Sequence, residues 1–232
     1  MKKEIHEAQA KILKNLLFRE KARFSELNTE GLSTDHFAFH LKQLIENGVI
    51  EKGEDGYYCF TPEGKEYANR FDVDSERIRI EKQAKLGVLI VASKEENGNR
   101  FLLMQERLKH PYFGLRGFVT GKIKMGESVS ETAARELKEE TGLSATLEQK
   151  AIYHERVFSA LGELLEDKYF FIFTAENPKG TLIESFEGGK NEWREEVKVL
   201  DGLIFYDIGD ILSLVQNKEF IFAEKSYTVE KY

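Results

Sequence analysis

The sequence between residues 121 and 143 reads GKIKMGESVSETAARELKEETGL, and it decides the fold and the chemistry that we expect. Ser128 and Glu131 form a Ser-x-x-Glu capping box, a pattern that marks the first turn of a helix. Gly142 is suited to end that helix, because glycine adopts the left-handed conformation at low cost. We therefore predict a helix over residues 128–141 with a loop on either side.

Three carboxylates share one face of this predicted helix. Glu136, Glu139 and Glu140 stand at positions i, i+3 and i+4, and each such like-charge contact costs about 0.2–0.5 kcal/mol in an isolated helix. A divalent cation would offset this repulsion, since Mg²⁺ takes oxygen ligands and is commonly shared between carboxylates and substrate phosphates. On these three residues alone, a solvated acidic face is the favoured interpretation.

The wider spacing reverses that interpretation. Gly121 is followed by five residues, Glu127, seven residues, and then the run RELKEETGL at residues 135–143. This pattern resembles the Nudix box at every position that the motif fixes. The resemblance implies a Nudix α/β/α sandwich with a mixed sheet, and an Mg²⁺- or Mn²⁺-dependent pyrophosphohydrolase that cleaves a nucleoside diphosphate linked to another moiety.

The resemblance also implies roles for the residues of the box. It assigns Glu136, Glu139 and Glu140 to the metal, with Glu127 close to the metal, directly or through water. Glu139 and Glu140 are also expected to be catalytic, together with Arg135, which would orient Glu127. The metal would polarise the phosphoryl oxygens and help to generate hydroxide from water.

In many members of the family a general base assists the attacking water, and it comes either from the box or from a later loop, here expected at residues 184–193. Its candidates are Glu184, Glu187 and Glu192. An acidic residue shortly before a tryptophan, here Trp193, is familiar in this part of the family, and we favour Glu187. The alternative is that all three are exposed glutamates without a catalytic role.

The approach to the box, residues 111–120, holds the candidates for substrate contacts. Many relatives have Pro-Gly just before the box glycine, where this chain has Val119-Thr120, a departure at a strand end that should not disable the metal site. Arg116 and Tyr112 could contact phosphate or base, and a structural role is the alternative. Gly121 is expected beside the substrate, where it lets the backbone turn.

The substrate is inferred by elimination. Relatives that act on ADP-ribose or dinucleoside polyphosphates often carry a proline or tyrosine at a set distance past the box. Residues 157–167 contain neither. A nucleoside triphosphate, normal or oxidised, is the remaining expectation.

The beginning of the chain follows another pattern. Apolar residues at helical spacing predict a first helix, Ser33 is a good N-cap for a third, and Asp55-Gly56 between β-formers predicts a hairpin. The order resembles a winged helix-turn-helix domain, which we place at residues 1–75, with the Nudix domain at 76–232. The buried stripe expected on the third helix is Phe37, Leu41, Leu44 and Ile45, with His36 and His40 at the surface or half-buried.

Two functions remain open for this first domain. DNA binding needs Lys or Arg against phosphate, yet residues 1–72 hold 11 basic and 13 acidic side chains, a balance of −2 within a net charge of −7. The alternative is a contact module for protein or for a homodimer. For the whole chain, the alternative to an active hydrolase is a transcription regulator that senses a nucleotide metabolite and binds DNA through the winged helix. Such regulators often have incomplete boxes, so the intact box favours hydrolysis.

Strand patterns fill the second domain. We expect strands at residues 78–81, 86–92, 101–105, 151–158, 169–175 and 203–206, and a helix at 208–215. The sequence has no apolar run long enough to span a membrane and no apolar stretch of a signal peptide near Met1. One cysteine, Cys59, cannot form an internal disulfide, which suits a cytoplasmic protein.

Overall fold

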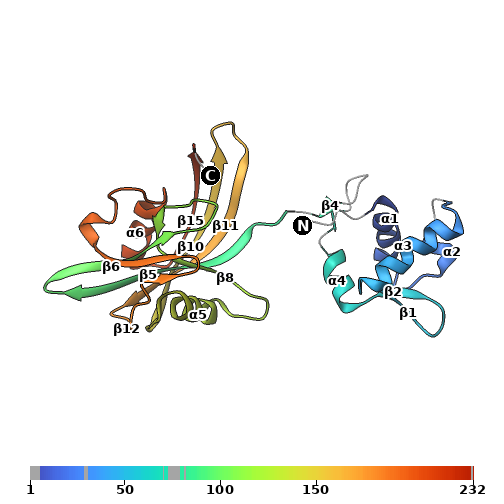
Figure 1. The fold of residues 1–232 in the computed structure, drawn as a ribbon, viewed down its shortest axis with the longest axis horizontal. Coiled ribbons are helices and arrows are strands. Elements are labelled where there is room, and N and C mark those ends of the chain that lie inside the picture. Colours follow the sequence, from blue (N-terminus) through green and yellow to red (C-terminus); the bar gives the residue numbers. More distant parts are fainter. Residues whose placement is uncertain (1–5, 29–30, 70, 73–78, 81, 231) are drawn as a thin grey trace. The chain divides into compact units, whose positions relative to one another are not determined.

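The computed structural model describes residues 6–28, 31–69, 71–72, 79–80, 82–230 and 232. The chain divides into two compact units, Met1–Lys82 and Gln83–Tyr232. Each unit is considered by itself below, and both are drawn in Figure 1. The predicted boundary between residues 75 and 76 lies outside the described residues.

The first unit has the element order of a winged helix. Ser33 caps α3 by accepting a hydrogen bond from the His36 amide, as expected, and Thr61 caps α4 in the same way. Pro62 occupies the first turn of α4, where its missing N–H costs nothing. The elements are α1 (Glu7–Leu17), α2 (Phe24–Leu27), α3 (Thr34–Glu46), the hairpin of β1 (Ile50–Lys52) and β2 (Tyr58–Phe60), α4 (Pro62–Ala68), β3 (Phe71–Asp72) and β4 (Arg79–Ile80).

Two residues of α3 differ from the predicted pattern. Ile45 was expected in the buried stripe but is 37% exposed, whereas His40 is buried at 3% exposure. His40 packs inward because its ring stacks on His6 from the start of α1, a contact that the helical period of α3 cannot show. On the outer face of α3, Lys42 forms an exposed ion pair with Glu46 at 3.6 Å, so an acidic side chain stands beside this basic one.

The second unit is built on a mixed sheet. The strand order is β13-β14-β6-β5-β11-β10-β15, with β7 paired to β6 and β8 paired to β5. The pairs β5–β11 and β10–β15 are parallel, and the other pairs are antiparallel. The strands are β5 (Lys85–Glu96), β6 (Asn99–Arg107), β7 (Arg116–Gly117), β8 (Val119–Lys122), β10 (Leu147–Ser159), β11 (Leu164–Glu176), β13 (Ser185–Phe186), β14 (Gly189–Glu195) and β15 (Ile221–Val229).

One helix covers each face of this sheet, as Figure 1 shows for α5 (Val129–Thr141) and α6 (Ile208–Gln216). Alternate residues of β5 point to opposite faces: Val88 and Ile90 pack with Leu137 of α5, whereas Leu89 and Val91 pack with Ile211 of α6. The predicted α/β/α sandwich with a mixed sheet is thereby confirmed. A short pair, β9 (Leu143–Ser144) with β12 (Lys179–Gly180), and the 3₁₀ turn η1 (Glu196–Lys198) complete the unit.

Some strand predictions were wrong. Residues 203–206 form no strand: Leu203 lies in a bend, Tyr206 lies in a turn, and Ile204 makes a single bridge to Arg116. Part of the segment expected to be a loop at residues 184–193 is the hairpin of β13 and β14. Strand β15 was missed, because it lies at the sheet edge and most of its side chains are exposed or half-buried, which weakens the apolar alternation.

A histidine in β10 is held by side chains from both neighbouring strands, β11 and β15. His154 is bound by Glu224 of β15 at 2.7 Å and by Asp167 of β11 at 2.9 Å, and its ring stacks on Tyr169. Burial alone would lower the pKa of His154, but the two carboxylates outweigh it and raise this pKa above its ordinary value. The charged form of the imidazole is therefore favoured in the folded state.

This arrangement predicts a pH dependence of stability. Because the folded-state pKa of His154 is raised, its contribution is complete below the unfolded pKa of about 6.5 and disappears as the pH rises through the folded value. We expect the urea midpoint of unfolding to fall between pH 6 and pH 9 in the wild type, and to fall by less in His154→Gln. Equal losses in the two proteins would contradict the expectation.

Among the described residues, no helix is both long and apolar enough to cross a membrane.

Candidate active site

The box residues run from strand β8 through a loop that carries Glu127 to helix α5 and the first residue of β9. Ser128 and Glu131 make both hydrogen bonds of the predicted capping box, and Gly142 ends the helix with φ +74°. Gly121 lies on β8, next to the helix. The helix therefore begins and ends where the sequence predicts.

Arg135 is the centre of the carboxylate cluster. Its guanidinium donates to Glu127 through Nε at 2.7 Å and Nη2 at 2.8 Å, and through Nη1 to Glu136 at 2.7 Å and Glu139 at 3.2 Å. The planar fork binds Glu127 through two nitrogens and still donates to two further carboxylates, four hydrogen bonds that the three donors of a lysine ammonium could not make. Glu127, Glu136 and Glu139 are thus brought together around one cation.

Arg135 also controls the charge of Glu127. Its hydrogen bonds, with further ones from the Thr132 hydroxyl and the Lys124 amide, lower the pKa of Glu127 to about 2. Glu127 in turn raises the pKa of Arg135. The pair stays fully charged at neutral pH.

Glu136 lies very close to the backbone of β8. A Cβ atom placed on Gly121 would come 2.0 Å from Cγ and 2.1 Å from Cδ of Glu136. Only glycine leaves room for this side chain, which explains the residue type at the first position of the box. Gly121 therefore acts as a cradle for one of the expected metal ligands.

Glu140 lies apart from the Arg135 cluster. Its Oε2 accepts a hydrogen bond from Gln105 Nε2 at 3.0 Å. Burial raises the pKa of Glu140, the Gln105 hydrogen bond opposes that shift, and the nearby Glu136 carboxylate adds to it. A half-buried carboxylate beside another carboxylate is a position where a bound cation would be favourable.

These residues fit a divalent cation by their chemistry. Four carboxylates stand on or beside one helix, and hard cations prefer carboxylate oxygens. In the part of the chain that the structure describes, no group of three acidic, histidine or cysteine side chains is arranged to enclose a cation. Three of the four carboxylates bind Arg135 instead.

A cavity of about 680 Å³ adjoins this cluster, and Glu136, Glu140 and Gly121 line it. Near them the lining is cationic, with Arg107, Lys109, Lys122 and Lys124. Phosphate groups are attracted to such side chains. The cavity therefore offers acidic side chains for a metal and basic side chains for phosphate within one space.

The remaining wall of the cavity is aromatic and carries buried acids that sequence reasoning missed. Phe170, Phe205 and Tyr206 line it together with Glu155 and Asp207, which are 2% and 6% exposed. Asp207 stands at the N-cap of α6 but makes no capping hydrogen bond with its side chain. Burial and the adjacent Glu155 carboxyl raise the pKa of Asp207 well above its usual range.

Of the three residues predicted to contact the substrate, two line the cavity and one does not. Gly121 and Tyr112 line the cavity, and Tyr112 is 6% exposed with its ring against Phe205 and Tyr206. Arg116 is not among the lining residues, and it forms ion pairs with Glu106 at 3.2 Å and Glu192 at 3.1 Å. Its charge is therefore already compensated by protein carboxylates.

Glu187 is exposed at the turn between β13 and β14 and does not line the cavity. The next residue, Gly188, accepts a hydrogen bond from the Leu108 amide at 3.0 Å. Leu108 precedes Lys109, which does line the cavity. The turn that carries Glu187 is thus attached to the rim.

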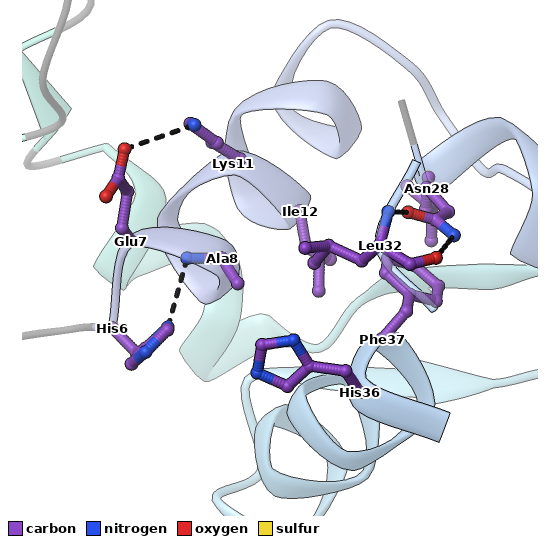
Figure 2. A pocket seen from close by; sticks show the side chains of 10 residues that line it. His6, Glu7, Ala8, Lys11, Ile12, Asn28, Leu32, His36 and Phe37 are labelled. Atoms are coloured by element: carbon purple, nitrogen blue, oxygen red, sulfur yellow. Dashed lines mark hydrogen bonds and ion pairs between the residues drawn. The ribbon is translucent and has the colours of Figure 1, made fainter. Parts of the chain in front are cut away.

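A smaller hollow of about 160 Å³ lies in the first unit, where Figure 2 shows His6 of α1 and His36 of α3 beside it. His36 and the buried His40 are hydrogen-bonded through their Nε2 atoms at 3.0 Å. His6 Nδ1 accepts from the Ala8 amide at 3.2 Å, so its ring caps α1. Ring packing and capping account for the placement of these histidines, although the buried Nδ1 of His40 has no hydrogen-bond partner among the described residues. The candidate site is the cavity of the second unit.

Comparisons with known proteins agree with this location. The family model of the NUDIX domain matches residues 83–207. The NUDIX domain of Shewanella oneidensis NrtR, in complex with ADP ribose, is 21% identical with a TM-score of 0.52, over 68% of this chain and 97% of that chain. A MutT protein from Bacillus halodurans is 24% identical with a TM-score of 0.51, over 62% and 90%.

At this level of identity the solved structures show a shared fold. No curated protein matches the chain. The family model, however, covers more than half of the chain and includes every residue of the box. The chain belongs to the NUDIX family of hydrolases.

Proposed function

We propose that the second unit hydrolyses the diphosphate bond of a nucleotide with the help of Mg²⁺ or Mn²⁺. The observation that carries this proposal is a set of four glutamates on and beside α5, two of which, Glu136 and Glu140, line a cavity that also has a cationic rim. Such a pairing of acids for a metal with bases for phosphate suits phosphoryl transfer.

The residues of the chain have distinct parts in this reaction. Glu136, Glu139 and Glu140 would hold the cation, with Glu127 beside it and Arg135 to orient Glu127. A bound divalent cation supplies polarisation of a phosphoryl oxygen and a water of lowered pKa. The basic rim side chains would bind the phosphate oxygens and orient the diphosphate for attack.

We keep Glu187 as the proposed general base. It follows that the turn between β13 and β14 must bring its carboxylate to the attacking water. The attachment of Gly188 to Leu108, at the cavity rim, supports that position. The alternatives within the same segment are Glu184, which is exposed, and Glu192, which is held by Arg116.

For the substrate we propose a nucleoside triphosphate, normal or oxidised. The aromatic wall of Phe170, Phe205 and Tyr112 can pack against a base, and the buried carboxyl groups of Asp207 and Glu155 can hydrogen-bond its polar edge. Four basic residues at the rim suit more than two phosphates. The solved NrtR domain was found with ADP ribose, which makes that compound the second substrate to test.

DNA binding by the first unit stays a prediction. The unit has the element order of a winged helix, but Lys42 on the exposed face of α3 is paired with Glu46, and Asp35 and Phe39 share that face. A contact with another protein or with a second copy of the chain suits this face equally.

A metal-supplemented substrate screen tests the proposed function. We expect the purified chain with Mg²⁺ or Mn²⁺ to convert nucleoside triphosphates to monophosphates and pyrophosphate, and a chelator to abolish the activity. ADP-ribose, nucleotide sugars and dinucleoside polyphosphates serve as comparison substrates. Absence of turnover with every compound, or turnover that survives chelation, would contradict the proposal.

A further inference from the structure

Two amide side chains lie between the sheet and the end of α5 that carries Glu140. Gln105 of β6 and Asn191 of β14 stand directly opposite each other in the antiparallel ladder. Two residues away on each strand, Leu103 and Trp193 belong to the apolar core that packs against α5. Because strand side chains alternate, Gln105 and Asn191 face the same helix, and polar groups replace apolar ones at this point.

Both amides bind Glu140, one at its side chain and one at its main chain. Gln105 Nε2 donates to Glu140 Oε2 at 3.0 Å and to Asn191 Oδ1 at 3.3 Å. Asn191 Nδ2 donates to the main-chain oxygen of Glu140 at 2.8 Å and to that of Ile183 at 2.7 Å. The network thus fixes the last turn of α5 and the carboxylate at the same time.

The main-chain contact has a clear physical reason. The last four carbonyl groups of a helix have no partner within the helix, and the Glu140 carbonyl is one of them. Asn191 is 5% exposed, and its amide satisfies this carbonyl where water has little access. The Ile183 amide does the same for the carbonyl of Thr141, at 2.9 Å.

We propose that Gln105 and Asn191 are positioning residues that hold the Glu140 carboxylate at the cavity wall in the orientation that binds the divalent cation. The inference rests on the proposed function. Gln105 occupies Oε2 and leaves the second oxygen, Oε1, for the cation. Partners that orient metal ligands in this way typically change metal affinity by about 10–100-fold.

Gln105→Met is the variant that tests this inference. Methionine has a similar length and keeps the packing volume, but it cannot donate a hydrogen bond to Glu140. We expect the dissociation constant for Mn²⁺, followed by the electron paramagnetic resonance of free Mn²⁺ without substrate, to rise about 10-fold. We expect kcat to fall with little change in KM, since the rim that binds phosphate is untouched.

Gln149→Met is the matched control. Gln149 is also a half-buried strand glutamine of the same sheet, on β10, and it does not line the cavity. Its variant should bind Mn²⁺ as the wild type does and melt at a similar temperature. If Gln105→Met does not fold, Gln105→Asn keeps an amide there that is one methylene too short to reach Glu140, and the same loss of affinity is expected.

Glu140→Gln distinguishes a failure of the positioning role from a failure of the proposed metal site. If Glu140→Gln weakens Mn²⁺ binding while both Gln105 variants bind it normally, the positioning role is wrong and the proposed function stands. If Glu140→Gln also binds Mn²⁺ normally, the metal site itself is misplaced and both proposals fail. A lower melting temperature of Gln105→Met with unchanged Mn²⁺ affinity would show a role in packing alone and would overturn the inference.

Discussion

Replacement of Glu139 and Glu140 together by glutamine is expected to lower kcat/KM at least about 1000-fold, or about 4 kcal/mol in transition-state stabilisation. Glutamine keeps the size of each side chain and removes its charge, and a cation that loses two carboxylates no longer stabilises the charge on the phosphoryl group. The fold should persist, because Glu139 is exposed and an amide oxygen at position 140 can still accept the hydrogen bond from Gln105.

The measurement is the rate of pyrophosphate release with a nucleoside triphosphate and saturating Mg²⁺. Glu163→Gln with Glu176→Gln is the control, since it changes the net charge equally at two exposed glutamates that do not line the cavity. That control should retain wild-type activity. Wild-type rates in the Glu139 and Glu140 double variant would remove the basis of the proposed site.

Much of the site could be predicted because its information is local. The capping box of Ser128 and Glu131, the stop at Gly142 and the helical spacing of the glutamates all lie within about two dozen residues. Each depends on contacts between residues a few positions apart. The structure places these residues on α5 as expected.

The rest of the site depends on contacts between distant segments. Gln105, Asn191 and Asp207 belong to three elements that meet only in the folded sheet. The sequence had one weak signal for Gln105: it is a polar residue on the strand face where Leu103, two positions earlier, is apolar. It had none for Asp207, which reads as an ordinary helix cap although its side chain makes no capping bond.

Long-range contacts also explain where the fold predicted from the sequence was wrong. Strand β15 pairs in parallel with β10, some 70 residues earlier, and a parallel edge strand with mostly exposed or half-buried side chains has little sequence signature. His40 was expected nearer the surface because its burial depends on a contact with His6, at the N-terminus of α1, which the pattern of α3 alone does not show. Residues 203–206 have strand-forming side chains but form no strand, and Ile204 makes only a single bridge to Arg116 of β7.

Gly121→Ala is expected to lower kcat/KM about 100-fold, the loss that a displacement of about 1 Å in a reacting group can cause. The new Cβ would stand 2.0 Å from Glu136 Cγ, so the Glu136 side chain must leave its place beside β8. Strand β8 has little freedom to retreat, because Gly121 is paired with Val88 of β5 within the sheet. The variant therefore displaces one expected metal ligand without changing its charge.

Gly209→Ala is the matched control for this variant. Gly209 lies in α6, where a Cβ would meet nothing within 4 Å and the backbone has no positive φ. Alanine there should keep full activity and stabilise the helix by about 0.5–1 kcal/mol. In Gly121→Ala, Mn²⁺ affinity and kcat should fall together while the urea midpoint changes little. Full activity with normal Mn²⁺ binding in that variant would mean that Glu136 is not held at β8 in the working enzyme, and that the metal depends on the other three glutamates.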